Sequence, residues 1–218
     1  MSLSSLKARL RERLRPVADW DGAAPALRSD FDLNPSATRP ERTLRPAAVL
    51  IAVVETADGA SVVLTRRADT LNSHGGQIAF PGGRLEPGET AVDAALREAM
   101  EEVALDPASV EVLGLGETYE TGTGFLVTPV VGWLDRAPLL TADPGEVADI
   151  FEVPWDFLMD VANHRRDWLE LEPGERRWFW AMPWRDRYIW GVTAGIVRGL
   201  RTRLYGEADE AVVAEDAA

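Results

Sequence analysis

Cysteine is absent from the 218 residues of this chain, and histidine occurs only twice, as His74 and His164. Disulfide bonds and cysteine-based zinc sites are therefore excluded, and a histidine metal cluster is disfavoured. The lack of cysteine also fits a reducing compartment. We therefore predict a cytoplasmic protein.

Long hydrophobic segments are missing as well. The longest strongly apolar run, Ala47 to Val54, has eight residues, whereas a membrane-spanning helix needs about 20. The amino-terminal sequence MSLSSLKARLRERLRP has no apolar segment typical of a secretory signal. It is basic and loosely amphipathic, which favours a helix docked on the surface, with a transit peptide or a membrane-surface helix as the alternative. We expect no membrane partner.

Positive charge is scarce, because 23 Lys and Arg residues face 36 Asp and Glu residues, for a net charge of −13. This excess would repel a phosphate backbone, so a nucleic-acid partner is disfavoured. Hydrophobic residues make up 46% of the chain, enough for one substantial core.

Composition divides the chain into three segments. Residues 1–45 combine the amino-terminal helix with an irregular lead-in, and residues 206–218 form an acidic tail that we predict to be disordered. Residues 46–205 carry the strand and helix patterns, with hairpins and no regular strand-helix alternation. We therefore predict an α/β protein in which a sheet is sandwiched between helices.

Local signals place several elements within residues 46–205. Asp58-Gly59 predicts a hairpin, and Thr90 with Asp93 predicts a capped helix start. Pro129 predicts an edge strand or a bulge. Three further elements are expected: a short helix near Pro154, a hairpin around Pro173-Gly174 and a final helix from about Ile189 to Tyr205.

Six of the eight tryptophans lie between Trp155 and Trp190. One interpretation is packing in the core and the hairpin. The other is a ring-stacking surface or a dimer interface, so a homodimer is an expectation.

Three glutamates, Glu98, Glu101 and Glu102, stand at positions i, i+3 and i+4 of a predicted helix. This spacing places them on one face, where their charges repel each other. A divalent cation would reverse that repulsion, because hard cations such as Mg²⁺ prefer carboxylate oxygen. Taken alone, the trio is typical of a solvated helix face.

The residues around the trio resemble the Nudix box, with the pattern G-x5-E-x7-R-E-U-x-E-E-x-G-U, where U is apolar. Six of its seven fixed identities are present: Gly83, Glu89, Arg97, Glu98, Glu101 and Glu102. Ala104 stands where the family has a glycine. Alanine in a left-handed helix terminus would cost about 1 kcal/mol, unless the helix ends differently.

The resemblance implies a Nudix-type α/β/α sandwich with a mixed β-sheet, and hydrolysis of a diphosphate with Mg²⁺ or Mn²⁺ as cofactor. Glu98, Glu101 and Glu102 would hold the metal, Arg97 would pair with Glu89, and the Gly82-Gly83 turn would let the backbone approach closely. A further carboxylate outside the box often serves as metal ligand or base. We choose Glu146 for this role, with Glu117 and Glu120 as rivals.

The stretch from Leu64 to Gly83 resembles the signature of the coenzyme A pyrophosphatase branch, L-L-T-x-R-[SA]-x3-R-x3-G-x3-F-P-G-G. Asn72 replaces an arginine of that signature, and asparagine lacks its charge. The resemblance implies cleavage of coenzyme A or an acyl derivative to 4′-phosphopantetheine and adenosine 3′,5′-bisphosphate. The candidate substrate-binding residues are Arg66, Arg67, His74, Gln77, Gly82 and Gly83.

Two other functions stay open. Asn72 leaves room for a Nudix hydrolase of another nucleoside-diphosphate derivative. A Nudix ligand-binding module without turnover is the second, and a lost glutamate in the box would favour it, but none is lost.

Overall fold

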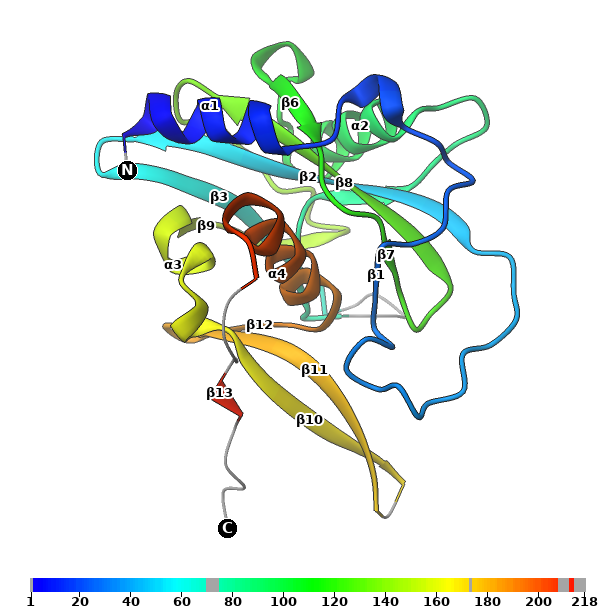
Figure 1. Ribbon diagram of the computed structural model, residues 1–218. Helices are drawn as coiled ribbons and strands as arrows, with labels where there is room; N and C mark the ends of the chain where they lie inside the picture. Colours follow the sequence, from blue (N-terminus) through cyan, green and yellow to red (C-terminus); the bar gives the residue numbers. More distant parts are fainter. Residues whose placement is uncertain (1, 70–74, 173, 208–211, 214–218) are drawn as a thin grey trace.

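A large mixed sheet forms the centre of the structure, and helices cover both of its faces (Figure 1). The computed structural model describes residues 2–69, 75–172, 174–207 and 212–213. Within them, the strands of the large sheet are β1 (Arg28–Ser29), β2 (Arg45–Thr56), β3 (Gly59–Arg67), β4 (Ile78–Ala79), β5 (Gly82–Arg84), β6 (Glu111–Leu115), β7 (Tyr119–Glu120), β8 (Phe125–Leu134) and β9 (Val147–Pro154).

The strand order is β1-β7-β8-β2-β3-β4, with β5 beside β2, β6 beside β8 and β9 beside β3. The pairs β1–β7 and β2–β8 are parallel, and the other pairs are antiparallel. The predicted α/β class with a mixed sheet is therefore confirmed. The antiparallel pairing of β2 with β3 also confirms the hairpin at Asp58-Gly59.

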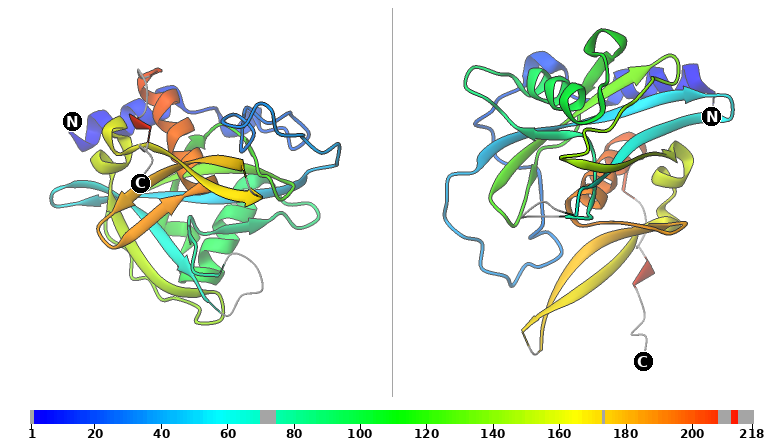
Figure 2. Two further views of the ribbon diagram at one scale, coloured as in Figure 1. Left: turned by 90° about the horizontal axis from the view of Figure 1, so that it is seen from below. Right: turned by 180° about the vertical axis from the view of Figure 1, so that it is seen from behind.

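A second, smaller sheet has the order β12-β11-β10-β13. Its strands are β10 (Arg165–Glu172), β11 (Glu175–Trp184), β12 (Arg187–Trp190) and β13 (Val212–Val213). The β10–β11 ribbon is the expected second hairpin, and it extends away from the body (Figures 1 and 2). Two residues of the acidic tail form β13, which pairs in parallel with β10.

Four α-helices complete the described chain: α1 (Leu3–Arg13), α2 (Ala91–Val103), α3 (Trp155–Met159) and α4 (Gly191–Tyr205). Three short 3-10 turns lie at Val17–Asp19, Pro107–Ser109 and Val161–Asn163. The expected short helix at Pro154 corresponds to α3, which has Pro154 as its N-cap. None of the described helices is long and apolar enough to cross a membrane.

Alternation along β2 divides the core into two layers, because successive side chains of a strand point to opposite faces. Ala48, Leu50 and Val54 pack with α2 on one face. Ala47 and Ile51 pack with α1 and α4 on the other. The two helical layers lie on opposite sides of the sheet (Figure 2). The sheet therefore separates α2, with its glutamates, from α4.

The final helix begins at Gly191, so the predicted start at Ile189 is wrong. Ile189 belongs to β12 and pairs with Met182 of β11. Gly191 adopts a φ of 61°, which turns the chain from strand to helix. The error arose because a buried strand residue happened to continue the helical apolar pattern of Val192 and Ile196.

Pro129 lies in an interior strand, so of the two expected positions the edge is wrong. The other, a bulge, fits the pairing, because three residues between β6 and β7 stand opposite Thr128 and Pro129. β8 pairs with β2 on one side and with β6 and β7 on the other. The Pro129 carbonyl oxygen accepts a hydrogen bond from Gly116 N, in the gap between β6 and β7. Its nitrogen faces the same gap, where no ladder donor is required.

The helix that carries the glutamates has the predicted start. Thr90 and Asp93 form a capping box, in which each side chain bonds the other residue's backbone N–H. At the other end, Ala104 has a φ of 55° and a ψ of 31°, the left-handed conformation that favours glycine. The helix therefore ends as the family glycine would end it, with an alanine under strain.

Ala104→Gly is expected to raise the free energy of unfolding by about 1 kcal/mol, because glycine adopts this conformation without a Cβ clash. Chemical denaturation measures the change. Ala108→Gly is the matched control, since Ala108 is exposed nearby and has no positive φ. Glycine there should lower stability by adding freedom to the unfolded chain. Equal effects of the two changes would contradict strain at Ala104.

Candidate functional site

Arg97 forms hydrogen bonds with three carboxylates of the site. Its Nε and Nη2 donate to the two carboxylate oxygens of Glu89 at 2.7 and 3.0 Å. Nη1 donates to Glu98 at 2.9 Å and to Glu101 at 3.1 Å. Nη2 also reaches the carbonyl oxygen of Arg84 at 3.0 Å. The bond to Glu89 lowers the pKa of that carboxyl and raises the pKa of Arg97. One guanidinium thus ties the loop before α2 to the helix.

Gly82 and Gly83 allow a close approach between β5 and the carboxylates of α2. A Cβ on Gly83 would overlap the carboxylate of Glu98, and a Cβ on Gly82 would overlap the carbonyl oxygen of Ala48. The N–H of Gly82 donates to Glu102 at 3.3 Å. The carboxylates therefore lie directly against the backbone of the turn.

Glu102 is the most deeply buried of the three box glutamates on α2, with a side chain only 3% exposed. Burial raises its pKa to about 7, against the opposing charge of Arg67, whose Nη1 lies 3.5 Å from Oε1. Burial also raises the pKa of Glu98, with Arg97 opposing it. Burial removes water from Glu98 and Glu102, and the neighbouring arginines do not fully offset this loss. A site with two such carboxylates favours the binding of a further positive charge.

The donor set suits a hard divalent cation, which binds carboxylate oxygen. Within the described residues, no group of three or more His, Cys, Asp or Glu side chains is already arranged to hold a metal ion. The ion pairs of Arg97 with Glu98 and Glu101 explain why these carboxylates do not converge on a common point. The side chain of Glu101 is 58% exposed, so solvent leaves it room to reorient. The residues present therefore fit a cation once these ion pairs rearrange.

Glu146 lies in the turn before β9. Its carbonyl oxygen accepts a hydrogen bond from Ala68 N at 2.8 Å. Burial is the main cause of the raised pKa values of Glu98 and Glu102, and the charge of Glu146 adds to both shifts. The structure thus brings Glu146 into the electrostatic range of the trio.

The two rival carboxylates are held elsewhere. Glu117 pairs with Arg28 at 2.7 Å. Glu120 is buried on β7 and pairs with Arg39. Neither carboxylate is among the causes of the raised pKa values of Glu98 and Glu102.

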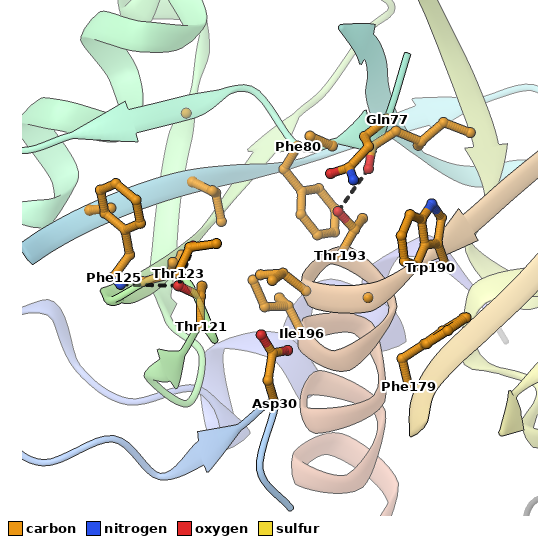
Figure 3. A pocket seen from close by; sticks show the side chains of 18 of the residues that line it. Asp30, Gln77, Phe80, Thr121, Thr123, Phe125, Phe179, Trp190, Thr193 and Ile196 are labelled. Carbon is orange, nitrogen blue, oxygen red and sulfur yellow. Dashed lines mark hydrogen bonds between the residues drawn. The ribbon is translucent and has the colours of Figure 1, made fainter. Parts of the chain in front are cut away.

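A pocket of about 510 Å³ opens beside the glycine turn, between the large sheet, α4 and the second sheet (Figure 3). Gly82 and Gly83 form part of its wall. Its apolar lining includes Ile78, Phe80, Phe125, Phe179, Trp190 and Ile196. The turn therefore has carboxylates on its α2 side and a largely apolar cavity on the other.

The predicted substrate-binding residues divide into three groups. Arg67 and Gln77 line the pocket together with the two glycines. Arg66 does not line it, and its guanidinium instead pairs with Asp69 at 3.1 Å in an exposed position. His74 lies outside the described residues, as does Asn72, the position at which the branch signature has an arginine.

Sequence reasoning missed several parts of the pocket wall. Asp30 comes from the lead-in, Arg84 from β5 and Thr193 from α4. Trp178 and Trp190 belong to the tryptophan-rich segment, so the ring-stacking interpretation was the available signal for them. Nothing in the local sequence marks Asp30.

Comparison with known proteins agrees with this geometry. The NUDIX domain family matches residues 44–171. Two relatives named "Uncharacterized Nudix hydrolase NudL", from Cronobacter sakazakii and Citrobacter koseri, are 37% and 39% identical to this chain. Each alignment covers 79% of this chain and 89% of the relative. A solved Nudix hydrolase from M. smegmatis, RenU, aligns with a TM-score of 0.43 and 24% identity, over 53% of this chain and 73% of that chain.

The chain belongs to the Nudix family, and it is a hydrolase of a diphosphate-containing small molecule. Nudix hydrolases generally use divalent metal ions such as Mg²⁺ or Mn²⁺. The names of the two relatives specify no substrate.

Gly83→Ala is expected to lower turnover by about 100-fold or more, because the new Cβ displaces the carboxylate of Glu98. Circular dichroism should show an intact fold. Gly199→Ala is the control, since a Cβ there meets its neighbours at ordinary distances of 3.6 and 3.8 Å. Wild-type turnover in Gly83→Ala would show that this approach is not needed for catalysis.

Glu102→Gln tests the buried carboxylate through pH. The folded pKa of about 7 lies above the ordinary 4.5. Without metal, the wild type therefore has full stability from this group below about pH 4.5 and loses it as the pH rises through about 7. The glutamine variant lacks this titration. Its thermal stability in chelator should fall less than that of the wild type between about pH 5 and pH 8.

The same variant tests cation binding. Adding Mg²⁺ or Mn²⁺ should raise the Tm of the wild type, because a ligand that binds only the folded state stabilises it. The shift should be smaller in Glu102→Gln and unchanged in Glu12→Gln, which alters an exposed glutamate of α1. Equal shifts in all three proteins would remove Glu102 from the cation site.

Proposed function

We propose that this protein hydrolyses the diphosphate of coenzyme A or an acyl derivative. The products are 4′-phosphopantetheine, or its acyl form, and adenosine 3′,5′-bisphosphate. The observation that carries the proposal is the Gly82-Gly83 turn, which has the box glutamates on one side and the pocket on the other. The upstream signature from Leu64 to Gly83 supports the choice of substrate.

In this proposal Glu98, Glu101, Glu102 and Glu146 hold the divalent cation. When bound, such a cation neutralises diphosphate charge and lowers the pKa of a coordinated water. Arg97 positions the glutamates and the loop through its bonds to Glu89 and to the backbone. The absence of side chains at Gly82 and Gly83 would let the diphosphate approach the backbone of the turn closely.

The interior of the pocket supports a pantetheine or acyl arm as its occupant. Thr193 Oγ1 already donates to the carbonyl oxygen of Ile78 at 2.9 Å. The hydroxyls of Thr121 and Thr123 bond each other at 3.0 Å. These bonds leave a mainly apolar surface, which an alkyl chain fits better than a charged group does (Figure 3). Arg67 and Gln77 stand where the arm would join the diphosphate.

The proposed division of the chain follows from this site. Residues 46–205 form the hydrolase domain, because they supply the box and most of the pocket wall. The lead-in within residues 1–45 adds Asp30 to that wall. Residues 206–218 contribute nothing to the lining among the described residues.

Product analysis by mass spectrometry tests the proposal. The purified protein is incubated with coenzyme A, ADP-ribose, NADH or a dinucleoside polyphosphate, each with Mg²⁺ or Mn²⁺. We expect release of 4′-phosphopantetheine from coenzyme A, and its loss in Glu101→Gln, which removes one carboxylate charge from the cation site. Turnover of another substrate instead would reject coenzyme A and retain the box chemistry.

The second candidate is a nucleoside-diphosphate derivative other than coenzyme A. Asn72 favours it, because the branch signature has an arginine at that position. Turnover of ADP-ribose or NADH with coenzyme A left intact would select this candidate.

A further inference from the structure

Two arginines converge on one aromatic ring beside the glycine turn. The guanidinium of Arg45 lies 4.0 Å from the ring centroid of Phe125, and that of Arg84 lies 5.3 Å from it. Like charges repel, so two cations on a single ring gain from any anion placed between them. This arrangement therefore has the electrostatics of an anion site.

Strand register places these residues on the face of the sheet that bears the pocket. Arg45 pairs with Phe125 across β2 and β8, and Ala47 pairs with Arg84 across β2 and β5. Paired residues share a face, and residues two apart on β2 do as well. Ala47, Arg84 and Phe125 all line the pocket. Arg84 directly follows Gly83, so its side chain stands one residue from the turn.

Neither guanidinium is neutralised by a carboxylate among the residues that the structure describes. The guanidinium of Arg45 donates to the carbonyl oxygen of Thr123 at 3.0 Å. Arg97 bonds the backbone carbonyl oxygen of Arg84 and leaves the Arg84 guanidinium on the ring of Phe125. Arg97, by contrast, holds three carboxylates. In a chain with a net charge of −13, the pair keeps its charge available for a ligand.

We propose that Arg45 and Arg84, stacked on Phe125, bind a phosphomonoester group of the substrate next to the diphosphate that is cleaved. The inference rests on the proposed function. Arginine forks match phosphate oxygens and grip them with paired hydrogen bonds. In coenzyme A the phosphomonoester is the 3′-phosphate, on the ribose attached to the diphosphate. Its short separation from the diphosphate suits the one-residue step from Gly83 to Arg84.

This arrangement fixes the direction of the bound substrate. The nucleotide phosphate lies at the mouth of the pocket, over Phe125, and the pantetheine arm enters the apolar interior. Asn72 stands where the branch signature has an arginine, and Arg45 and Arg84 supply positive charge in its place. Specificity for a 3′-phosphorylated nucleotide thus comes from residues outside the sequence signature.

Turnover of coenzyme A and of 3′-dephospho-coenzyme A tests the site. The two compounds share the diphosphate and the pantetheine arm and differ only in the phosphomonoester. The readout is the ratio of their kcat/KM values in the wild type, Arg84→Gln and Arg45→Gln. We expect each change to lower the ratio by about 10- to 100-fold, the effect of removing a charge-assisted hydrogen bond to phosphate.

Arg136→Gln is the matched control. Arg136 is an exposed arginine just past the end of β8, and that strand runs about 30 Å from Phe125 to Leu134. The Arg136→Gln change removes one positive charge and leaves Arg45 and Arg84 unaltered. The ratio of the two kcat/KM values should therefore stay at the wild-type value. The proposal would be overturned if the ratio were unchanged in Arg84→Gln and Arg45→Gln. Equal losses of kcat/KM on both substrates count as an unchanged ratio.

A binding measurement separates this inference from the proposed function. Calorimetry compares adenosine 3′,5′-bisphosphate with AMP, which lacks the second phosphate, and needs no turnover. Tighter binding of the bisphosphate that is lost in Arg84→Gln supports the site even if coenzyme A is not hydrolysed. Equal affinity of the wild type for both nucleotides overturns the site even if coenzyme A is hydrolysed.

Discussion

The ion pairs of Arg97 are the constraint on which the site depends. One guanidinium holds Glu89 in the loop, Glu98 and Glu101 on α2, and the carbonyl oxygen of Arg84 on β5. The acceptor on β5 is the backbone oxygen of Arg84. Arg97 therefore connects the strand to the helix and leaves the side chain of Arg84 free of this contact. Without Arg97, the carboxylates would repel each other and the loop would lose its anchor. The spacing of the Nudix box therefore fixes a loop geometry, and the proposed cation ligands are positioned by that geometry.

The glycine turn joins two environments that the sheet keeps apart. On the α2 side, buried carboxylates lie against the backbone of Gly82 and Gly83. On the other side, the same residues form the wall of a largely apolar pocket. A Cβ on Gly83 would overlap the carboxylate of Glu98, and a Cβ on Gly82 would overlap the backbone of β2. The proposed reaction needs this arrangement, because the diphosphate must reach the cation held by the carboxylates while an uncharged arm is held in the pocket.

The sequence allowed prediction of those features whose signals are local. The capping box of Thr90, the spacing of the glutamates and the left-handed end at Ala104 each depend on a few neighbouring residues. Features set by distant partners were not predictable. Pro129 is tolerated in an interior strand only because β6 and β7 are interrupted beside it. Glu146 was our choice among three carboxylates, but its electrostatic effect on Glu98 and Glu102 follows from tertiary packing, since its spacing in the sequence is no better than that of its rivals.

Internal hydrogen bonds decide what the pocket offers to a ligand. Asp30 lines it, yet its two oxygens accept from Tyr119 Oη at 2.9 Å and from Gly122 N at 2.6 Å. Burial, together with the charge of Asp30, raises the pKa of Tyr119, so this phenol stays protonated and remains a donor. The carboxylate that comes from the lead-in is therefore used to join that segment to β7, and is not left for a substrate. With the interior polar groups satisfied in this way, the interior discriminates by shape and apolar contact. In our proposal, recognition of charge depends on Arg45 and Arg84, whose guanidinium groups lie close to the ring of Phe125.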